Sequence, residues 1–393
     1  MAVTSDVLGF TAGTAAAGVR DGTPTRTDVA LIVSDRPCAA AGVFTTNQVI
    51  AAPCVVTRRH LEQGRLRAIV VNSGNANACT GEQGERHAVM MARAAAQRVG
   101  CDPYEVAVAS TGVIGVPLPV ERIMKAVKGM GLRPGEWIGV ARAIMTTDTK
   151  PKLIGVEVPL NAGTVHLRGI AKGAGMIHPN MATMLAFLVT DAEVAAEQLQ
   201  EILEDAADES FNLISIDGDT STNDTLLALA NGASGVQLRG DDLKTFGSAV
   251  RGLCEILARE ILADGEGVTK VFEVRVSGAA SADDARRAAR TITTSNLVKT
   301  AIHGADPNWG RILAAAGRSG AKVDQNKASV HIADVAVFAQ GSPRPFDGGA
   351  IRRVFEQKDI TIGVDLGVGA ASARAWGTDL SAEYVRINAD YTT

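Results

Sequence analysis

A threonine that directly follows a glycine-rich polar loop is the residue of this sequence best suited to do chemistry. Within the stretch 169–189, a glycine-rich polar loop runs into Thr183, and a hydrophobic run at 184–189 follows. If the Ala182–Thr183 peptide bond broke, Thr183 would carry a hydroxyl and a free α-amine, whose pKa is about 8 in model compounds. The amine can accept the hydroxyl proton, so one residue supplies nucleophile and base. The alternative interpretation is a threonine that begins a strand after an ordinary loop.

Other catalytic signatures do not occur in the sequence. It contains no G-x-S-x-G elbow, Walker A loop or H-E-x-x-H motif. The run DGDTSTN at 217–223 resembles a calcium loop, but that loop needs Gly and Glu where Thr222 and Ala228 stand. The six histidines form no ligand cluster, and none of the five cysteines belongs to a C-x-x-C pair. We therefore expect no metal and no cofactor, and the cysteine usage indicates the cytoplasm.

The bulk composition argues against several classes of protein. The 393 residues have a net charge of −4 with mixed signs, so we expect no nucleic-acid partner and no attraction to an anionic membrane. No apolar run of about 18 residues predicts a membrane span, and the N-terminal residues do not have the pattern of a signal peptide. A hydrophobic fraction of 46% with only 4% aromatic residues predicts a core of Ala, Val, Ile and Leu.

Strands and helices alternate irregularly along the chain, and they must position Thr183. Near-continuous apolar runs predict strands buried on both faces, whereas alternation at 271–276 predicts a strand with one wet face. We expect strands at 29–33, 67–71, 106–109, 155–160, 184–189, 226–230, 271–276, 329–332 and 360–364, and helices at 86–99, 120–128, 195–208, 241–262 and 283–291. The pattern favours stacked sheets covered by helices, with a boundary between lobes near 173–183.

Ten motifs together resemble one known family. The segment KGAGMIHPNMATML at 172–185 resembles the cleavage-site signature of the ornithine acetyltransferase (glutamate N-acetyltransferase) family. The other nine are GVFTTN at 42–47, VNSGNANACTG at 71–81, STGVIG at 110–115, IMTTDT at 144–149, DGDTSTND at 217–224, DGEG at 264–267, LVKT at 297–300, DPNWGR at 306–311 and YVRINADYTT at 384–393. Many motifs in one order are more specific than any single motif.

The resemblance implies a fold and a maturation step. The fold is α+β, a four-layer αββα sandwich similar to that of the DmpA-type aminopeptidases, with an N-terminal nucleophile. Self-cleavage between Ala182 and Thr183 gives an α fragment, residues 1–182, and a β fragment, residues 183–393. The fragments stay together, and the resemblance implies an assembly of two α and two β chains. Gly173 and Gly175 allow the loop to adopt a strained geometry before the cut.

The resemblance also implies a reaction and its residues. Acetyl passes from N2-acetyl-L-ornithine to L-glutamate through an acetyl-Thr183 enzyme, a ping-pong step of arginine biosynthesis. Thr111 and Gly112 match the oxyanion-hole positions, where a hydroxyl and a backbone N–H stabilise the developing charge. Six residues match substrate-binding positions: Thr146, Lys172, Thr183, Glu266, Asn388 and Thr393. Lys172 suits a substrate carboxylate, and Glu266 suits the ornithine ammonium.

Alternatives remain open on the sequence alone. A self-cleaving aminopeptidase or amidase of the DmpA type would use Thr183 in the same way, with water as the acceptor. A non-catalytic binding protein with this fold would not cleave itself. The sequence does not decide whether acetyl-CoA is a second acetyl donor, nor whether the chain is a secondary-metabolism paralogue with another substrate. It also assigns no role to the motifs at 217–224 and 306–311.

Overall fold

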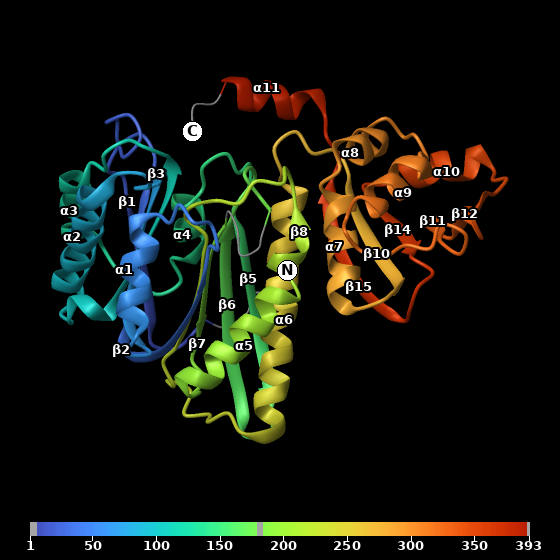
Figure 1. The fold of residues 1–393 in the computed structure, drawn as a ribbon. Helices are drawn as coiled ribbons and strands as arrows, with labels where there is room; N and C mark the ends of the chain where they lie inside the picture. The colour runs from blue at the N-terminus through green and yellow to red at the C-terminus, as the bar shows by residue number, and fades with distance from the viewer. Residues whose placement is uncertain (1–5, 179–183, 391–393) are drawn as a thin grey trace. The chain divides into compact units, whose positions relative to one another are not determined.

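Contacts along the chain divide the structure, a computed structural model that describes residues 6–178 and 184–390, into two units. Unit 1 contains residues 6–212 and 219–261, and unit 2 contains 213–218 and 262–390. Each unit holds one mixed β-sheet and several helices (Figure 1). This composition confirms the α+β class.

Unit 1 is built on a sheet of eight strands. The order is β4-β3-β2-β9-β7-β6-β5, with β1 paired to β2. The strands are β1 (Phe10–Ala15), β2 (Val29–Phe44), β3 (Arg65–Asn75), β4 (Val106–Val113), β5 (Lys152–Leu160), β6 (Gly163–Lys172), β7 (Leu185–Thr190) and β9 (Thr225–Ala230). The helices are α1 (Ala52–Leu61), α2 (Gly81–Val99), α3 (Val120–Lys128), α4 (Trp137–Ala143), α5 (Ala196–Asp208) and α6 (Gly240–Ala263), with 3-10 turns η1 (Pro103–Glu105) and η2 (Phe211–Leu213).

The long strand β2 separates this sheet into two halves that pack on each other. Its first part pairs with β3, and its last part, residues 39–44, pairs with β9. One hydrophobic core joins the halves, with Ile69 and Ala107 from one half and Phe187 and Leu227 from the other. We call this the interlayer core.

Helices cover the outer faces of the two halves. On the first half, Val70 of β3 and Val108 of β4 pack with α2 and α3. On the second half, α6 lies so close to β6 that a side chain at Gly169 would lie 2.3 Å from a methyl group of Leu253. The order helix, half-sheet, half-sheet, helix is the expected αββα sandwich.

Unit 2 is built on a sheet of seven strands in the order β13-β12-β11-β14-β10-β15-β8. The strands are β8 (Ile214–Ser215), β10 (Val271–Ala279), β11 (Ser329–Ile332), β12 (Val335–Ala339), β13 (Ser342–Pro343), β14 (Asp359–Asp365) and β15 (Ala371–Thr378). The helices are α7 (Ala282–Thr293), α8 (Asn296–His303), α9 (Trp309–Gly317), α10 (Gly348–Phe355) and α11 (Ala382–Asp390).

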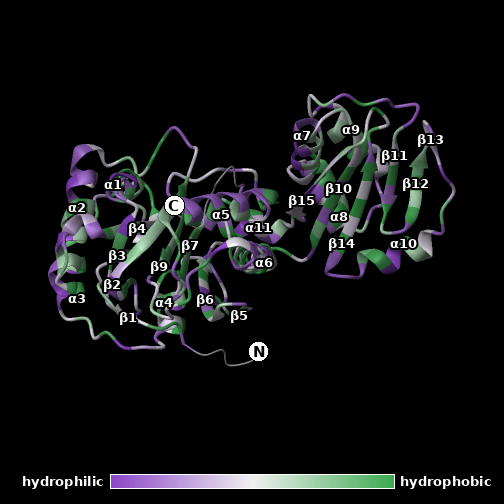
Figure 2. Ribbon diagram, turned by 90° about the horizontal axis from the view of Figure 1, so that it is seen from below, coloured by the Kyte–Doolittle hydropathy of each residue, from purple (hydrophilic) through white to green (hydrophobic). Residues whose placement is uncertain are grey.

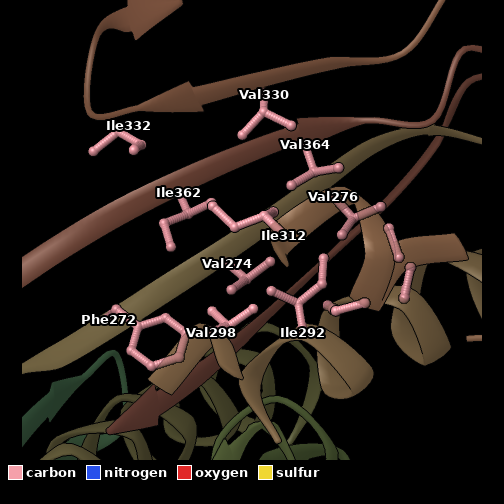
Figure 3. Packing of buried hydrophobic residues seen from close by; sticks show 14 of the residues in the cluster. Phe272, Val274, Val276, Ile292, Val298, Ile312, Val330, Ile332, Ile362 and Val364 are labelled. Atoms are coloured by element: carbon pink, nitrogen blue, oxygen red, sulfur yellow. The ribbon is translucent and has the colours of Figure 1, made fainter. Parts of the chain in front are cut away.

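The core of unit 2 follows from alternation along its strands. Phe272, Val274 and Val276 of β10 are buried against Ile292 of α7 (Figure 3). Arg275, between two of these residues, is exposed. Figure 2 shows hydrophobic colour on β10 and β14 and hydrophilic colour on α7. The predicted strand with one wet face is therefore confirmed.

All nine expected strands and all five expected helices occur within the described residues, with longer bounds at most ends. No helix in these residues is long and apolar enough to cross a membrane.

The expected boundary between lobes near 173–183 is wrong, because the chain passes between the units near residues 212, 218 and 261. The loop before residue 183 joins β6 to β7, and these strands pair in unit 1 with Lys172 opposite Leu185. In the sheet order, β7 and β9 lie between β2 and β6. A cut in this loop would leave two fragments that share one sheet, so their separation would require breaking its central ladders.

Candidate active site

The end of β4 carries the predicted oxyanion residues. Thr111 continues the alternation of Ala107 and Ala109, which face the interlayer core. Gly112 has a φ of +133°, and a Cβ there would lie 2.3 Å from the backbone carbon of Gly74. Only glycine allows the β3 and β4 backbones to approach so closely in this conformation.

Lys172 joins two predicted groups of residues. It ends β6 on the face that Ile170 contributes to the interlayer core, and it is buried. Its Nζ donates to the hydroxyl of Thr146 at 2.8 Å and to the hydroxyl of Thr111 at 3.2 Å. Three residues predicted from separate motifs therefore meet at one end of the interlayer core.

A buried aspartate that the sequence analysis did not single out supports this cluster. Asp148 accepts a hydrogen bond from Lys152 Nζ at 2.7 Å, from the Gly173 N–H at 2.7 Å and from the Thr146 N–H at 3.1 Å. Burial alone would raise the pKa of Asp148, but the Lys172 and Lys152 ammoniums outweigh it and hold the pKa below its usual value. The carboxylate thus fixes the loop backbone at both Thr146 and Gly173. In the sequence, the four-residue spacing of Asp148 and Lys152 is the feature that could have indicated this ion pair.

Asn223 ties the start of β9 to the oxyanion strand. Its side-chain amide donates to the carbonyls of Ala76 at 2.6 Å and Ser110 at 2.9 Å. Ser110 in turn donates to Asn72 of β3 at 2.7 Å. The motif at 217–224, which had no assigned role, therefore helps to hold the strand that carries Thr111.

The remaining described substrate residues meet in unit 2. Glu266 is buried, and its Oε2 accepts a hydrogen bond from Asn388 Nδ2 of α11 at 2.8 Å. Gly267 has a φ of +66°, and a Cβ there would lie 2.4 Å from the Tyr384 nitrogen, so the turn packs directly on α11. Two residues predicted from motifs more than 100 positions apart are therefore hydrogen-bonded.

Three predicted positions, Ala182, Thr183 and Thr393, lie outside the described residues. Met184 is the first described residue after the expected cut. Its backbone N–H donates to Asp224 Oδ1 at 2.9 Å.

Comparison with known proteins gives a consistent result. Residues 11–393 match the model of the ArgJ family. The arginine biosynthesis bifunctional protein ArgJ of Symbiobacterium thermophilum is 50% identical over 390 residues, which cover 98% of this chain and 97% of that protein. Its counterpart in Dehalococcoides mccartyi is 48% identical over 388 residues, 98% of this chain and 96% of that protein. A crystal structure of arginine biosynthesis bifunctional protein ArgJ from Bacillus halodurans is 42% identical, with a TM-score of 0.51, and covers 53% of this chain and 100% of that one.

Proposed function

The chain belongs to the ArgJ family, and from that premise we propose that it transfers acetyl from N2-acetyl-L-ornithine to L-glutamate in arginine biosynthesis. The observation that carries the proposed site is the meeting of Lys172 with Thr111 and Thr146, directly beside the strand that follows Thr183. The family match favours this reaction over the aminopeptidase alternative.

The proposed cycle has two half-reactions on one hydroxyl. Thr183 Oγ attacks the acetyl carbonyl carbon, and its own α-amine takes the hydroxyl proton. The α-ammonium passes that proton to the ornithine nitrogen, the carbon–nitrogen bond breaks, and ornithine leaves. Glutamate then attacks the acetyl-threonine ester and regenerates the hydroxyl. Each half passes through a tetrahedral oxyanion, to which the Thr111 hydroxyl and the Gly112 N–H would donate. Since Thr183 is both nucleophile and base, this cycle needs no cofactor.

The substrate contacts follow from charge. The Lys172 ammonium, already aligned by two hydroxyls, suits the α-carboxylate that both substrates share. The Glu266 carboxylate, aligned by Asn388, suits the side-chain ammonium of ornithine. Thr393, at the end of the tail that follows α11, completes the proposed substrate set. We further propose that the two fragments assemble as two α and two β chains in the cytoplasm.

Replacement of Thr183 tests the mechanism. Wild-type protein should run as two fragments with a new N-terminus at Thr183, and N-acetylornithine alone should leave one acetyl group on the β fragment. Thr183→Ala should remain one inactive chain. Intact mass and a denaturing gel measure both results, and a fully active single wild-type chain would refute self-cleavage. Parallel assays with N-acetylornithine and with acetyl-CoA as donor to glutamate determine whether both donors are used.

Replacement of Glu266 tests substrate recognition separately from maturation. Glu266→Gln keeps the shape of the side chain and removes its charge, so cleavage should proceed. The kcat/KM for N-acetylornithine should fall by the equivalent of about 2–5 kcal/mol, the effect of removing one partner of a buried charge pair. Normal kinetics would return Glu266 to a structural role beside Asn388.

A further inference from the structure

A second buried carboxyl lies beside the proposed cut. Asp224 precedes β9 and Met184 precedes β7, two parallel neighbours in which Leu185 lies opposite Thr225. The Met184 N–H donates to Asp224 Oδ1 at 2.9 Å, and Asp224 has no exposed surface. The next peptide nitrogen upstream of the one that Asp224 already holds is the nitrogen of the Ala182–Thr183 bond, and consecutive Cα atoms are only about 3.8 Å apart.

The other carboxyl oxygen of Asp224 is unusual among the described residues. Oδ2 is buried and has no hydrogen-bond partner within residues 6–178 and 184–390. Buried polar atoms are almost always paired, so an exception at this position asks for a function. Burial raises the pKa of Asp224 well above its usual value, against the opposing effects of the Met184 N–H, the Thr45 hydroxyl and the Lys172 ammonium. Burial therefore favours the neutral, protonated form of this carboxyl.

We propose that Asp224 supplies the proton that lets the Thr183 nitrogen leave during self-cleavage. The inference rests on the proposed function, in which Thr183 attacks the Ala182 carbonyl. The bond from Thr183 Oγ to that carbon forms and the carbon–nitrogen bond breaks. The hydroxyl proton and the Asp224 proton both pass to the nitrogen, which leaves an ammonium beside a carboxylate. Water then hydrolyses the ester and releases the Ala182 carboxyl group.

The same carboxyl serves the mature enzyme. When one proton returns from the new ammonium to Asp224, both groups become neutral, and the amine is free to act as the base for acetyl transfer. A dry environment favours this neutral pair over the charged pair. Asp224 Oδ1 meanwhile holds the backbone at Met184, so that β7 begins at a fixed place after the nucleophile.

The test uses full-length chain made by cell-free synthesis, with timed samples on a denaturing gel. Asp224→Asn keeps an acceptor for the Met184 N–H but has no acidic proton. We expect it to fold and to cleave about 10²-fold more slowly or worse, the usual contribution of a general acid. The matched control is Asp28→Asn, because Asp28 is a buried aspartate of the same unit whose oxygens accept from the Ala17 and Val19 N–H groups at 2.7 Å. This control should cleave like wild type.

Further variants separate the possible outcomes. Asp224→Glu retains an acid and should cleave faster than Asp224→Asn, which also decides the case if the Asn variant does not fold. Added hydroxylamine, which cleaves esters, should not restore cleavage of Asp224→Asn, because the ester itself would not form. Wild-type cleavage rates in Asp224→Asn, equal slowing in Asp28→Asn, or full rescue by hydroxylamine would overturn the proposal. If wild type does not cleave at Thr183 at all, the proposed function fails instead.

Discussion

Two buried aspartates of unit 1 have pKa shifts of opposite direction, although both are removed from water. Asp148 accepts a hydrogen bond from Lys152 and is attracted electrostatically by Lys172. These two ammonium groups hold its pKa below the usual value, against the effect of burial. Oδ1 of Asp224 accepts a backbone N–H, its Oδ2 has no hydrogen-bond partner within the described residues, and burial raises its pKa well above the usual value. Depth of burial is similar, so the nearby ammonium groups make the difference.

The two aspartates are therefore suited to different functions at one site. Because its pKa is lowered, Asp148 is ionised near neutral pH, where it attracts the Lys172 ammonium and fixes the backbone at Thr146 and Gly173. Burial favours the neutral form of Asp224, which can give up a proton when a new amine forms beside it. Substitution of each aspartate by asparagine removes a charge in one place and almost none in the other.

The largest expected effect is at Asp148. In an uncleaved Thr183→Ala background, Asp148→Asn should lower the free energy of unfolding by about 3–5 kcal/mol, since two buried ammoniums lose their partner. Urea denaturation at pH 7 measures this. The control Asp241→Asn breaks an exposed pair with Lys244 and should change stability by about 1 kcal/mol or less. Equal effects at the two positions would show that Asp148 is not an ionised partner of the lysines.

Hydrophobic patterning predicted much of this fold. Continuous apolar runs such as 226–230 and the helical periodicity at 241–262 identified β9 and α6 because burial dictates both patterns. Patterning did not reveal β6, β15 or α4, whose sequences mix glycine, charge and alanine. Those elements form because neighbouring strands and helices supply their partners, which is tertiary information.

The candidate site was predicted to a different extent. Motif resemblance selected Thr111, Thr146 and Lys172, which the structure brings into hydrogen-bond contact. It did not assign roles to Asp148 or Asp224, because their functions depend on the ammonium groups nearby in space. Asp224 stands directly before a buried strand, and that position was the only local signal of its burial.

A buried cation in unit 2 extends the comparison. Lys299 donates to the carbonyl of Ile216 at 2.6 Å and to the hydroxyl of Thr378 at 3.1 Å. Burial lowers its pKa from 10.5 to about 8, against the attraction of Asp217 and Asp379. Between about pH 8 and 10.5 the unfolded chain binds this proton and the folded chain does not, so stability should rise with pH across that window.

Lys299→Met should therefore flatten the pH dependence of unfolding. In the same uncleaved background, the wild-type side chain adds up to about 3 kcal/mol between pH 8 and 10.5, at about 1.4 kcal/mol per pH unit. Urea midpoints at pH 8, 9 and 10 measure the slope. Lys244→Met, at an exposed position, should keep the wild-type slope. An unchanged slope in Lys299→Met would mean that Lys299 stays charged through hydrogen bonds alone.

The smallest expected effect is at Asp224. In the uncleaved background, Asp224→Asn should change the free energy of unfolding at about pH 3 by about 1 kcal/mol or less, because the carboxyl is neutral in the folded and the unfolded chain there and the amide oxygen still accepts the Met184 N–H. The pH dependence of the free energy of unfolding that Asp224 contributes is opposite to that of Asp148. A raised carboxyl pKa stabilises the folded chain below about pH 4 and loses that contribution as pH rises through the folded pKa. The stability of Asp224→Asn relative to its parent should therefore increase as pH rises. Asp148→Asn should be less destabilised relative to its parent at acid pH, where Asp148 of the parent is also protonated. Urea midpoints from pH 3 to 8 test both signs, and parallel profiles for the two variants would remove the contrast between the carboxyls.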